Sequence, residues 1–353
     1  MTVMPICRQP IVDYAGGTVV SLHVTGVLCE DPTAFRGAWP FAPDGLGHDS
    51  LRLTGALTTQ VGADGAAEVR TLVPQNLGTS AVDRHPALLD RELHRFFVPD
   101  GTAGPSAAHA TLLLAAEDWS GTTRDAAAQD VIKALAPTLA DAMGAVVGQR
   151  AKEDQDGGMF GWSVPGVDDT VRGIPNEDFA PVQTSFLVPG SPSSHVAGHE
   201  VVVAGLGGRA YRLTLQWRAR RLPAVDDVLN LQVHYGEFVV AEGGGRQMLV
   251  ANRPSPSDWE TFGLVRLGGD RVALLAPNGD FLSAEAGGGR EIFAGRAQIG
   301  EWEVFRVEEV MTDRIALRAF NGHYVSAYHG GGHQLVASRP VRDEYEVFTL
   351  HRP

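Results

Sequence analysis

The last third of the chain repeats itself three times with a constant period of 43 residues. The glycines that open the repeated segments, Gly236, Gly279 and Gly322, are each 43 residues apart. Four further sets of residues keep the same step: Trp259, Trp302 and Tyr345; Phe262, Phe305 and Phe348; Arg253, Arg296 and Arg339; Glu260, Glu303 and Glu346. A register without gaps indicates three copies of one supersecondary unit, which together span Val225 to Pro353.

Each unit has the pattern of four short strands. Asp270–Ala276 and Asp313–Ala319 alternate apolar and polar residues and lead into Asn278–Gly279 and Asn321–Gly322. Asn-Gly tolerates positive φ at both central positions of a turn, which right-twisted hairpins require. Glycine pairs stand where each unit must bend sharply, at Gly244–Gly245, Gly287–Gly288 and Gly330–Gly331. Three units of four strands predict a β-trefoil, which is a binding module rather than a catalytic one.

Equivalent apolar residues of the three units are expected to meet near the pseudo-three-fold axis. The predicted core residues are Leu231, Leu274 and Leu317; Leu249, Ile292 and Leu335; Phe262, Phe305 and Phe348. Burying each such side chain stabilises the fold by roughly 1.5–3 kcal/mol. One unit alone would leave that surface in water, so all three units are needed for a stable fold.

The repeated motif resembles that of the fascin-like β-trefoil family. It reads G-x-[YF]-[LV]-x-A-E-x-G-G, then L-x-A-x-R, then W-E-x-F, and the match is best from Gly279 to Phe305. The Q-x-W motif of ricin-type lectins is missing. The resemblance implies the trefoil fold and a surface for polysaccharide or protein. Fascins contain four such trefoils and bundle actin, whereas this chain contains one. Bundling is therefore not transferred, and an actin-binding or other protein-interaction adaptor remains an alternative function.

The third unit departs from the other two in a way that suggests a binding surface. It has Tyr328–His329 where the others have Glu242–Gly243 and Glu285–Ala286. Its candidate ligand-binding residues are His323, Tyr324, Tyr328, His329 and His333. Such rings stack on sugars and form hydrogen bonds, so we expect non-catalytic binding of carbohydrate. Neutral drift of the loop is the alternative. A tyrosine-rich hairpin loop is poorly suited to tetrahedral zinc, and no metal site is predicted.

The recurring aromatic residues, phenylalanines and arginines are interpreted as structural. Trp259 and Trp302 are alternatively sugar-stacking platforms, but their recurrence with phenylalanine three positions later favours a structural role. The arginines are expected to bond loop carbonyls or neighbouring glutamates.

Residues 1–221 are expected to form a separate, β-rich domain, with the trefoil over 225–353. Tyr211–Trp217 is the clearest strand, since Tyr211, Leu213, Leu215 and Trp217 alternate with polar residues. Further strands are expected at Thr18–Val24, Leu51–Leu57, Glu68–Val73, Thr111–Ala115 and Glu200–Ala204. This pattern favours an antiparallel β-sandwich-like domain. One helical excursion is expected from Arg124 to Arg150, with an apolar face against a sheet and Pro137 kinking or splitting it.

The segment from Ala151 to Pro192 is polar and rich in glycine and proline, and it is interpreted as a long connection. Its carboxylates are candidate calcium ligands or simply a solvated acidic loop: Asp154, Asp156, Asp168, Asp169, Glu177 and Asp178. Nucleotide-binding and nucleophile-elbow motifs are missing, so we assign no catalytic residue and no cofactor. An enzyme in the N-terminal domain, held on a glycan by the trefoil, stays open as an alternative.

Composition limits the partners and the compartment. A net charge of −13 argues against nucleic acid and anionic membranes as partners. Two cysteines, Cys7 and Cys29, leave a single bridge open but exclude a disulfide framework. The start of the sequence lacks a signal-peptide pattern, and the longest apolar run, Ala142–Val147, is too short for a membrane span. We therefore expect a soluble, cytoplasmic protein. The oligomeric state is left open.

Overall fold

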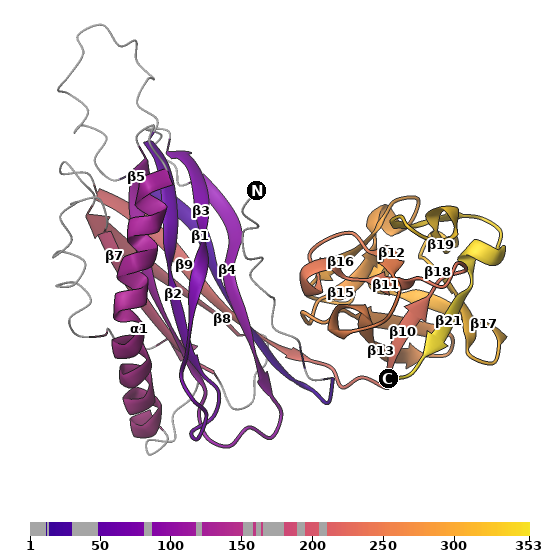
Figure 1. Ribbon diagram of the computed structural model, residues 1–353, viewed down its shortest axis with the longest axis horizontal. Coiled ribbons are helices and arrows are strands. Elements are labelled where there is room, and N and C mark those ends of the chain that lie inside the picture. Colours follow the sequence, from indigo (N-terminus) through magenta and orange to yellow (C-terminus); the bar gives the residue numbers. More distant parts are fainter. Residues whose placement is uncertain are drawn as a thin grey trace, which may run out of the picture. The chain divides into compact units, whose positions relative to one another are not determined.

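The chain folds into two compact units (Figure 1). The computed structural model describes residues 12, 14–29, 49–80, 87–117, 122–150, 158–159, 164, 180–188, 195–204 and 210–353. One unit is Val20–Arg220, called here the sandwich unit. The other, called the trefoil unit, joins Arg221–Pro353 with the described residues of Met1–Val19. The first described residues of the chain therefore belong to the same unit as its last third.

The sandwich unit contains two β-sheets. The strand order of the first sheet is β4 (Ala87–Pro99), β1 (Gly17–Cys29), β9 (Ala210–Leu222) and β8 (His195–Ala204). The order of the second is β3 (Glu68–Ser80), β2 (Asp49–Gln60), β5 (Ala107–Glu117), β7 (Ala180–Leu187) and β6 (Gly158–Met159). Ladders β2/β3, β2/β5, β5/β7 and β8/β9 are antiparallel. The expected mostly β fold with a sandwich-like N-terminal region is confirmed.

Alternation of apolar and polar residues builds the core between these sheets. Val20, Leu22 and Val24 of β1 are fully buried, as are the inward residues of β9. Trp217 of β9 stacks on Phe186 of β7 with ring centroids 5.5 Å apart, so the pair joins one sheet to the other. The strand pattern of Tyr211–Trp217 is thus confirmed.

One helix, α1 (Thr122–Arg150), covers the second sheet. Its predicted apolar face is confirmed, because Val131, Leu135 and Leu139 cluster with residues of β2 and β5. Pro137 does not split the helix, because α1 is one continuous element with Pro137 on its exposed side. Its window Gln129–Gln149 is, by length and composition alone, apolar enough to cross a membrane, a test that core helices of soluble proteins also pass.

The predicted long connection contains two strands that the sequence reading missed. β6 and β7 lie within Ala151–Pro192, and β7 is paired along its whole length with β5. The six candidate carboxylates of that segment lie outside the described residues, as does Cys7. Strand β4 was also not expected.

The trefoil unit contains twelve strands, as predicted. Six of them pair in a closed ring: β10 (Asp227–Gln232), β13 (Thr261–Gly268), β14 (Arg271–Leu275), β17 (Phe305–Met311), β18 (Arg314–Arg318) and β21 (Phe348–His351). The other six form three hairpins: β11 (Phe238–Val240) with β12 (Val250–Arg253), β15 (Phe281–Ala284) with β16 (Ile292–Arg296), and β19 (Tyr324–Ala327) with β20 (Leu335–Arg339). A barrel closed by three hairpins is the β-trefoil architecture.

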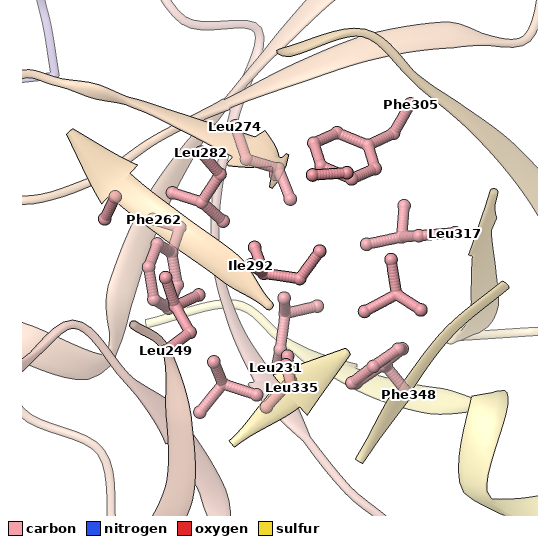
Figure 2. Close-up of a cluster of buried hydrophobic side chains, with 14 of the residues drawn as sticks. Leu231, Leu249, Phe262, Leu274, Leu282, Ile292, Phe305, Leu317, Leu335 and Phe348 are labelled. Atoms are coloured by element: carbon pink, nitrogen blue, oxygen red, sulfur yellow. The ribbon is translucent and has the colours of Figure 1, made fainter. Parts of the chain in front are cut away.

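The predicted trefoil core is confirmed residue by residue. All nine predicted side chains are buried in one hydrophobic cluster (Figure 2). Phe262, Phe305 and Phe348 are at most 1% exposed. Each unit contributes one phenylalanine, so the three repeats share a single core.

The turns differ from expectation in one respect. Gly279 and Gly322 have φ of 81° and 84°, but Asn278 and Asn321 are not among the positive-φ residues of this region. Each asparagine side-chain oxygen instead accepts a hydrogen bond, at 2.9 Å, from the backbone N–H two residues later. The asparagines therefore serve as side-chain acceptors within the turn rather than as left-handed residues. The glycine pairs at the predicted bends all have positive φ.

A segment near the start of the chain packs on the trefoil barrel. The Tyr14 hydroxyl donates to the Thr261 carbonyl at 2.7 Å, and the Val12 N–H donates to the Pro277 carbonyl at 2.8 Å. A Cβ at Gly263 would lie 2.6 Å from the Tyr14 ring, so glycine there makes room for the segment. Burial raises the pKa of Tyr14 far above its ordinary value.

Candidate functional site

Three of the five predicted ligand-binding residues form one exposed cluster of rings. Strand β19 runs into the 3-10 turn η7 (Tyr328–Gly330), which places Tyr328 and His329 next to each other. Their ring centroids are 4.1 Å apart, and those of Tyr328 and His333 are 5.8 Å apart. His329 and His333 close the triangle at 5.6 Å. We call Tyr328, His329 and His333 the upper ring cluster.

The backbone holds this cluster in an uncommon conformation. His329 has a φ of 57°, in the left-handed region, while the first unit has a glycine at this position, Gly243, with a φ of 65°. A side chain with φ above zero is costly unless the surroundings fix it. The Tyr328 side chain remains 47% exposed. The rings are therefore exposed to solvent next to a turn that contains a left-handed residue.

The other two predicted residues do not join the cluster. Tyr324 is only 9% exposed, and its hydroxyl donates to Glu308 at 2.6 Å, a bond that raises the pKa of the phenol. The Arg318 guanidinium lies 4.9 Å from the centre of the Tyr324 ring. His323 has its ring nitrogen 3.0 Å from the Asn321 side-chain amide. Both residues are thus engaged by other neighbours.

A second group of rings, which the sequence reading did not assign to the site, contacts the same turn. His234, Tyr235 and Tyr345 have ring centroids 4.9 to 6.0 Å apart, and the two tyrosine hydroxyls are 3.2 Å apart. A Cβ at Gly330 would lie 2.7 Å from Tyr235 and 2.8 Å from Tyr345. We call these three the lower ring cluster. Six rings, two of them from η7 itself, therefore lie at and around this turn, where the third unit meets the first.

The other two junctions contain fewer rings. The equivalent glycine between the second and third units, Gly287, faces Trp302 and Phe320. Between the first and second units the residue equivalent to Phe320 is Pro277. Comparison of the three repeats contains a hint of the lower ring cluster, because Tyr235 stands where Asn278 and Asn321 stand in the other units.

The repeated arginines have the structural contacts expected of them in two units. Arg253 donates to both oxygens of Glu242 at 2.7 and 2.9 Å, and Arg296 does the same with Glu285 at 2.8 Å. Each repeated glutamate ends a 3-10 turn that includes Trp259, Trp302 or Tyr345, and it accepts from the backbone N–H of the residue just before that turn.

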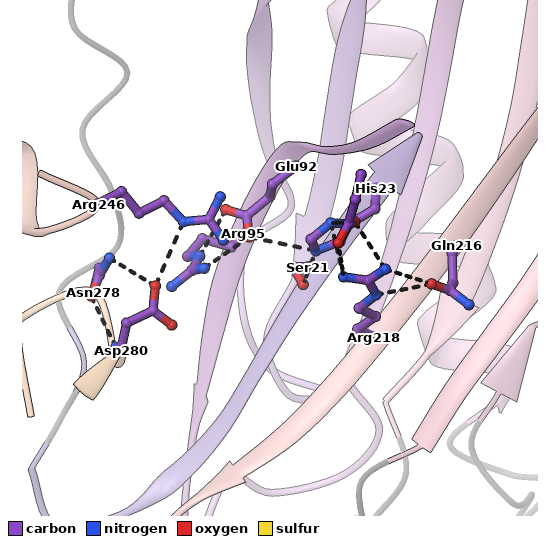
Figure 3. A network of polar contacts seen from close by, with 10 residues as sticks. Ser21, His23, Glu92, Arg95, Gln216, Arg218, Arg246, Asn278 and Asp280 are labelled. Carbon is purple, nitrogen blue, oxygen red and sulfur yellow. Dashed lines mark hydrogen bonds and ion pairs between the residues drawn. The ribbon is translucent and has the colours of Figure 1, made fainter. Parts of the chain in front are cut away.

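A polar network on the first sheet of the sandwich unit joins β1, β4 and β9 (Figure 3). Ser21 Oγ lies 2.9 Å from His23 Nε2, and His23 Nδ1 lies 3.0 Å from an oxygen of Asp90. Arg218 contacts the same carboxylate at 2.9 Å. Ser21 and His23 are 8% and 6% exposed, and burial lowers the pKa of His23. This network was not predicted from the sequence, because Asp90 is distant in the sequence from Ser21 and His23.

Metal ligation finds no support in the residues that the structure describes. Within them, no group of three or more histidine, cysteine, aspartate or glutamate side chains is arranged to hold a metal ion.

Comparison with known proteins yields matches that include one family model over the trefoil region and two solved structures that each match 36% of the chain. A family model described as a domain of unknown function, DUF7910, matches residues 228–324 and 267–353. ThreeFoil, a designed three-fold symmetric protein, is 18% identical with a TM-score of 0.34, over 36% of this chain and 100% of its own. The Polyporus squamosus lectin bound to a human-type influenza-binding epitope is 11% identical with a TM-score of 0.32, over 36% of this chain and 49% of the lectin. Curated proteins yield no match to the chain.

Proposed function

We propose that this protein binds carbohydrate through the third unit of its trefoil. The observation that supports the proposal is the upper ring cluster, in which the exposed rings of Tyr328, His329 and His333 lie edge to face. Ring faces stack on the apolar faces of sugars, while imidazole and phenol groups bond hydroxyls. In this proposal the binding surface lies within residues 225–353 of the trefoil unit, and the sandwich unit is a second domain.

The lower ring cluster extends the same surface. Tyr235 is 63% exposed, and its N–H donates to the Gly330 carbonyl at 3.3 Å, which ties it to η7. A ligand longer than one sugar ring can therefore contact rings on both sides of the turn. We include His234, Tyr235 and Tyr345 as candidate contact residues for this reason.

Tyr328→Ala and His329→Ala test this site on a glycan array with the full-length chain. We expect each variant to weaken binding roughly tenfold or more, because one well-packed ring contact is worth about 1.4 kcal/mol. Phe320→Ala is the matched control, since Phe320 is an exposed ring, 59% accessible, at another junction. Equal losses in all three variants, or no glycan bound by the wild type, would refute the proposal.

The proposal includes that the trefoil is of the fascin-like kind. It rests on the motif from Gly279 to Phe305 and on the trefoil fold. The alternative that it implies is a protein-binding surface at the same rings. A folded chain without glycan binding would redirect the search to protein partners, with filament co-sedimentation as the first assay.

A second candidate function is acyl hydrolysis by the sandwich unit. Its support is the Ser21–His23–Asp90 chain of contacts, in which one ring nitrogen faces the serine hydroxyl and the other faces the carboxylate. This is the connectivity of a serine nucleophile, its general base and the carboxylate that orients the base. Lowering of the His23 pKa by burial keeps the imidazole neutral and able to accept the proton.

Labelling with a fluorophosphonate probe tests the hydrolase candidate. We expect the full-length chain to react at Ser21, and Ser21→Ala to abolish labelling, because the probe needs an activated hydroxyl. Ser185→Ala is the matched control, since Ser185 Oγ also lies 2.7 Å from a histidine nitrogen, that of His109. A wild-type chain that stays unlabelled would assign the network a structural role.

A further inference from the structure

The three repeats differ in how their arginine is paired. The arginine ends the second hairpin strand in every unit and has the same register, Arg253 opposite Phe238, Arg296 opposite Phe281 and Arg339 opposite Tyr324. In the first two units its partner is the glutamate that opens the 3-10 turn, Glu242 or Glu285. In the third unit Tyr328 occupies that position.

This replacement leaves Arg339 without a carboxylate. Residues 210–353 are described without a gap, and within them the Arg339 side chain forms no hydrogen bond or ion pair. The repeated glutamate next in sequence does not compensate. Glu260 and Glu303 lie 3.5 and 3.9 Å from their arginines, whereas no such ion pair links Arg339 to Glu346 among the described residues. Arg339 is exposed.

The freed guanidinium belongs to the unit with the upper ring cluster. Tyr328, which replaces the glutamate, is itself a member of that cluster. One substitution has therefore removed a negative charge, released a positive one and added an exposed ring at the same register. Arginine binds carboxylates through charge-assisted hydrogen bonds from a planar fork of donors.

We infer that the third unit binds acidic saccharides, with the ligand carboxylate on Arg339 and a sugar ring on Tyr328. The inference rests on the proposed carbohydrate function and specifies its substrate class as uronic- or sialic-acid-containing glycans. The first and second units lack this property because Glu242 and Glu285 neutralise their arginines.

The test is an array on which each acidic glycan stands beside its carboxyl-reduced, neutral counterpart. We expect the full-length chain to prefer the acidic member by roughly tenfold or more, the range of a charge-assisted hydrogen bond. Arg339→Gln should abolish this preference, whereas the matched Arg296→Gln should keep it. Tyr328→Glu should also abolish it, because it restores the ion pair of the other units.

The outcomes separate this inference from the function on which it rests. Equal binding of acidic and neutral members that still depends on Tyr328 would overturn the acidic specificity and leave carbohydrate binding intact. Retention of the preference in Arg339→Gln would overturn the role of Arg339. No binding of any glycan by the folded chain would overturn both. Thermal unfolding of each variant establishes that a loss of binding is not a loss of fold.

Discussion

Phe305→Ala is expected to destabilise the trefoil unit by about 3–5 kcal/mol, the usual cost of a large cavity in a core. Phe305 is 1% exposed and packs with Phe262 and Phe348, one from each repeat. A cavity on the pseudo-three-fold axis removes contacts from all three units at once. Urea unfolding of the full-length chain, followed by tryptophan fluorescence, measures the change.

Phe320→Ala is the control for this prediction. The Phe320 ring is 59% exposed, so its loss should cost less than about 1 kcal/mol. Comparable destabilisation by the two variants would contradict the shared core. A destabilisation by Phe262→Ala and by Phe348→Ala equal to that of Phe305→Ala would show that the three repeats contribute equally to the stability of the core.

Acidification is expected to destabilise the sandwich unit between about pH 6.5 and pH 4. Burial lowers the pKa of His94 and of His109 from 6.5 to about 4 in the folded protein. Below pH 6.5 the unfolded chain therefore binds protons that the folded chain does not, and stability falls until pH 4 is reached. Each shift corresponds to roughly 3 kcal/mol. Urea midpoints measured from pH 7.5 down to pH 5 test this.

His109→Gln separates this effect from general acid denaturation. The His109 nitrogens lie 2.7 Å from Ser185 Oγ and 3.1 Å from Thr111 Oγ1, so glutamine retains polar atoms there but does not titrate. Its stability should fall less steeply with pH than that of the wild type, because one of the histidines with a lowered pKa is removed. A wild-type stability that is constant from pH 7.5 to pH 5 would refute the assignment.

The trefoil fold could be predicted because its sequence pattern occurs three times in the chain. Three copies of one pattern show which positions stay apolar, and the nine apolar residues selected in this way lie in the core. Strands of the sandwich unit were harder to predict from the sequence where both of their faces are buried. In β7, Thr184 to Leu187 are all buried, because the strand lies between the inter-sheet core and α1, and alternation disappears. In β4, residues 93–96 are likewise buried in succession.

The candidate site was predictable in part for a related reason. Comparison of the units identified Tyr328, His329 and His333 by their departure from the repeat. Tyr235 and Tyr345 are 110 residues apart and meet only because the barrel closes from the third unit onto the first. Such a contact depends on how the first strand of the barrel pairs with the last, and local sequence patterns do not determine that pairing.

The attachment of Tyr14 to the barrel has a consequence for synthesis. Tyr14 and its partner Thr261 are separated by 247 residues, and the whole sandwich unit lies between them. At about 5–20 residues per second, a ribosome needs roughly 10–50 s to bridge that separation. During this interval Tyr14 has no barrel to pack on, while the strands of the sandwich unit leave the exit tunnel one after another. The trefoil unit is therefore completed only after the sandwich unit, although it includes the earliest described residues.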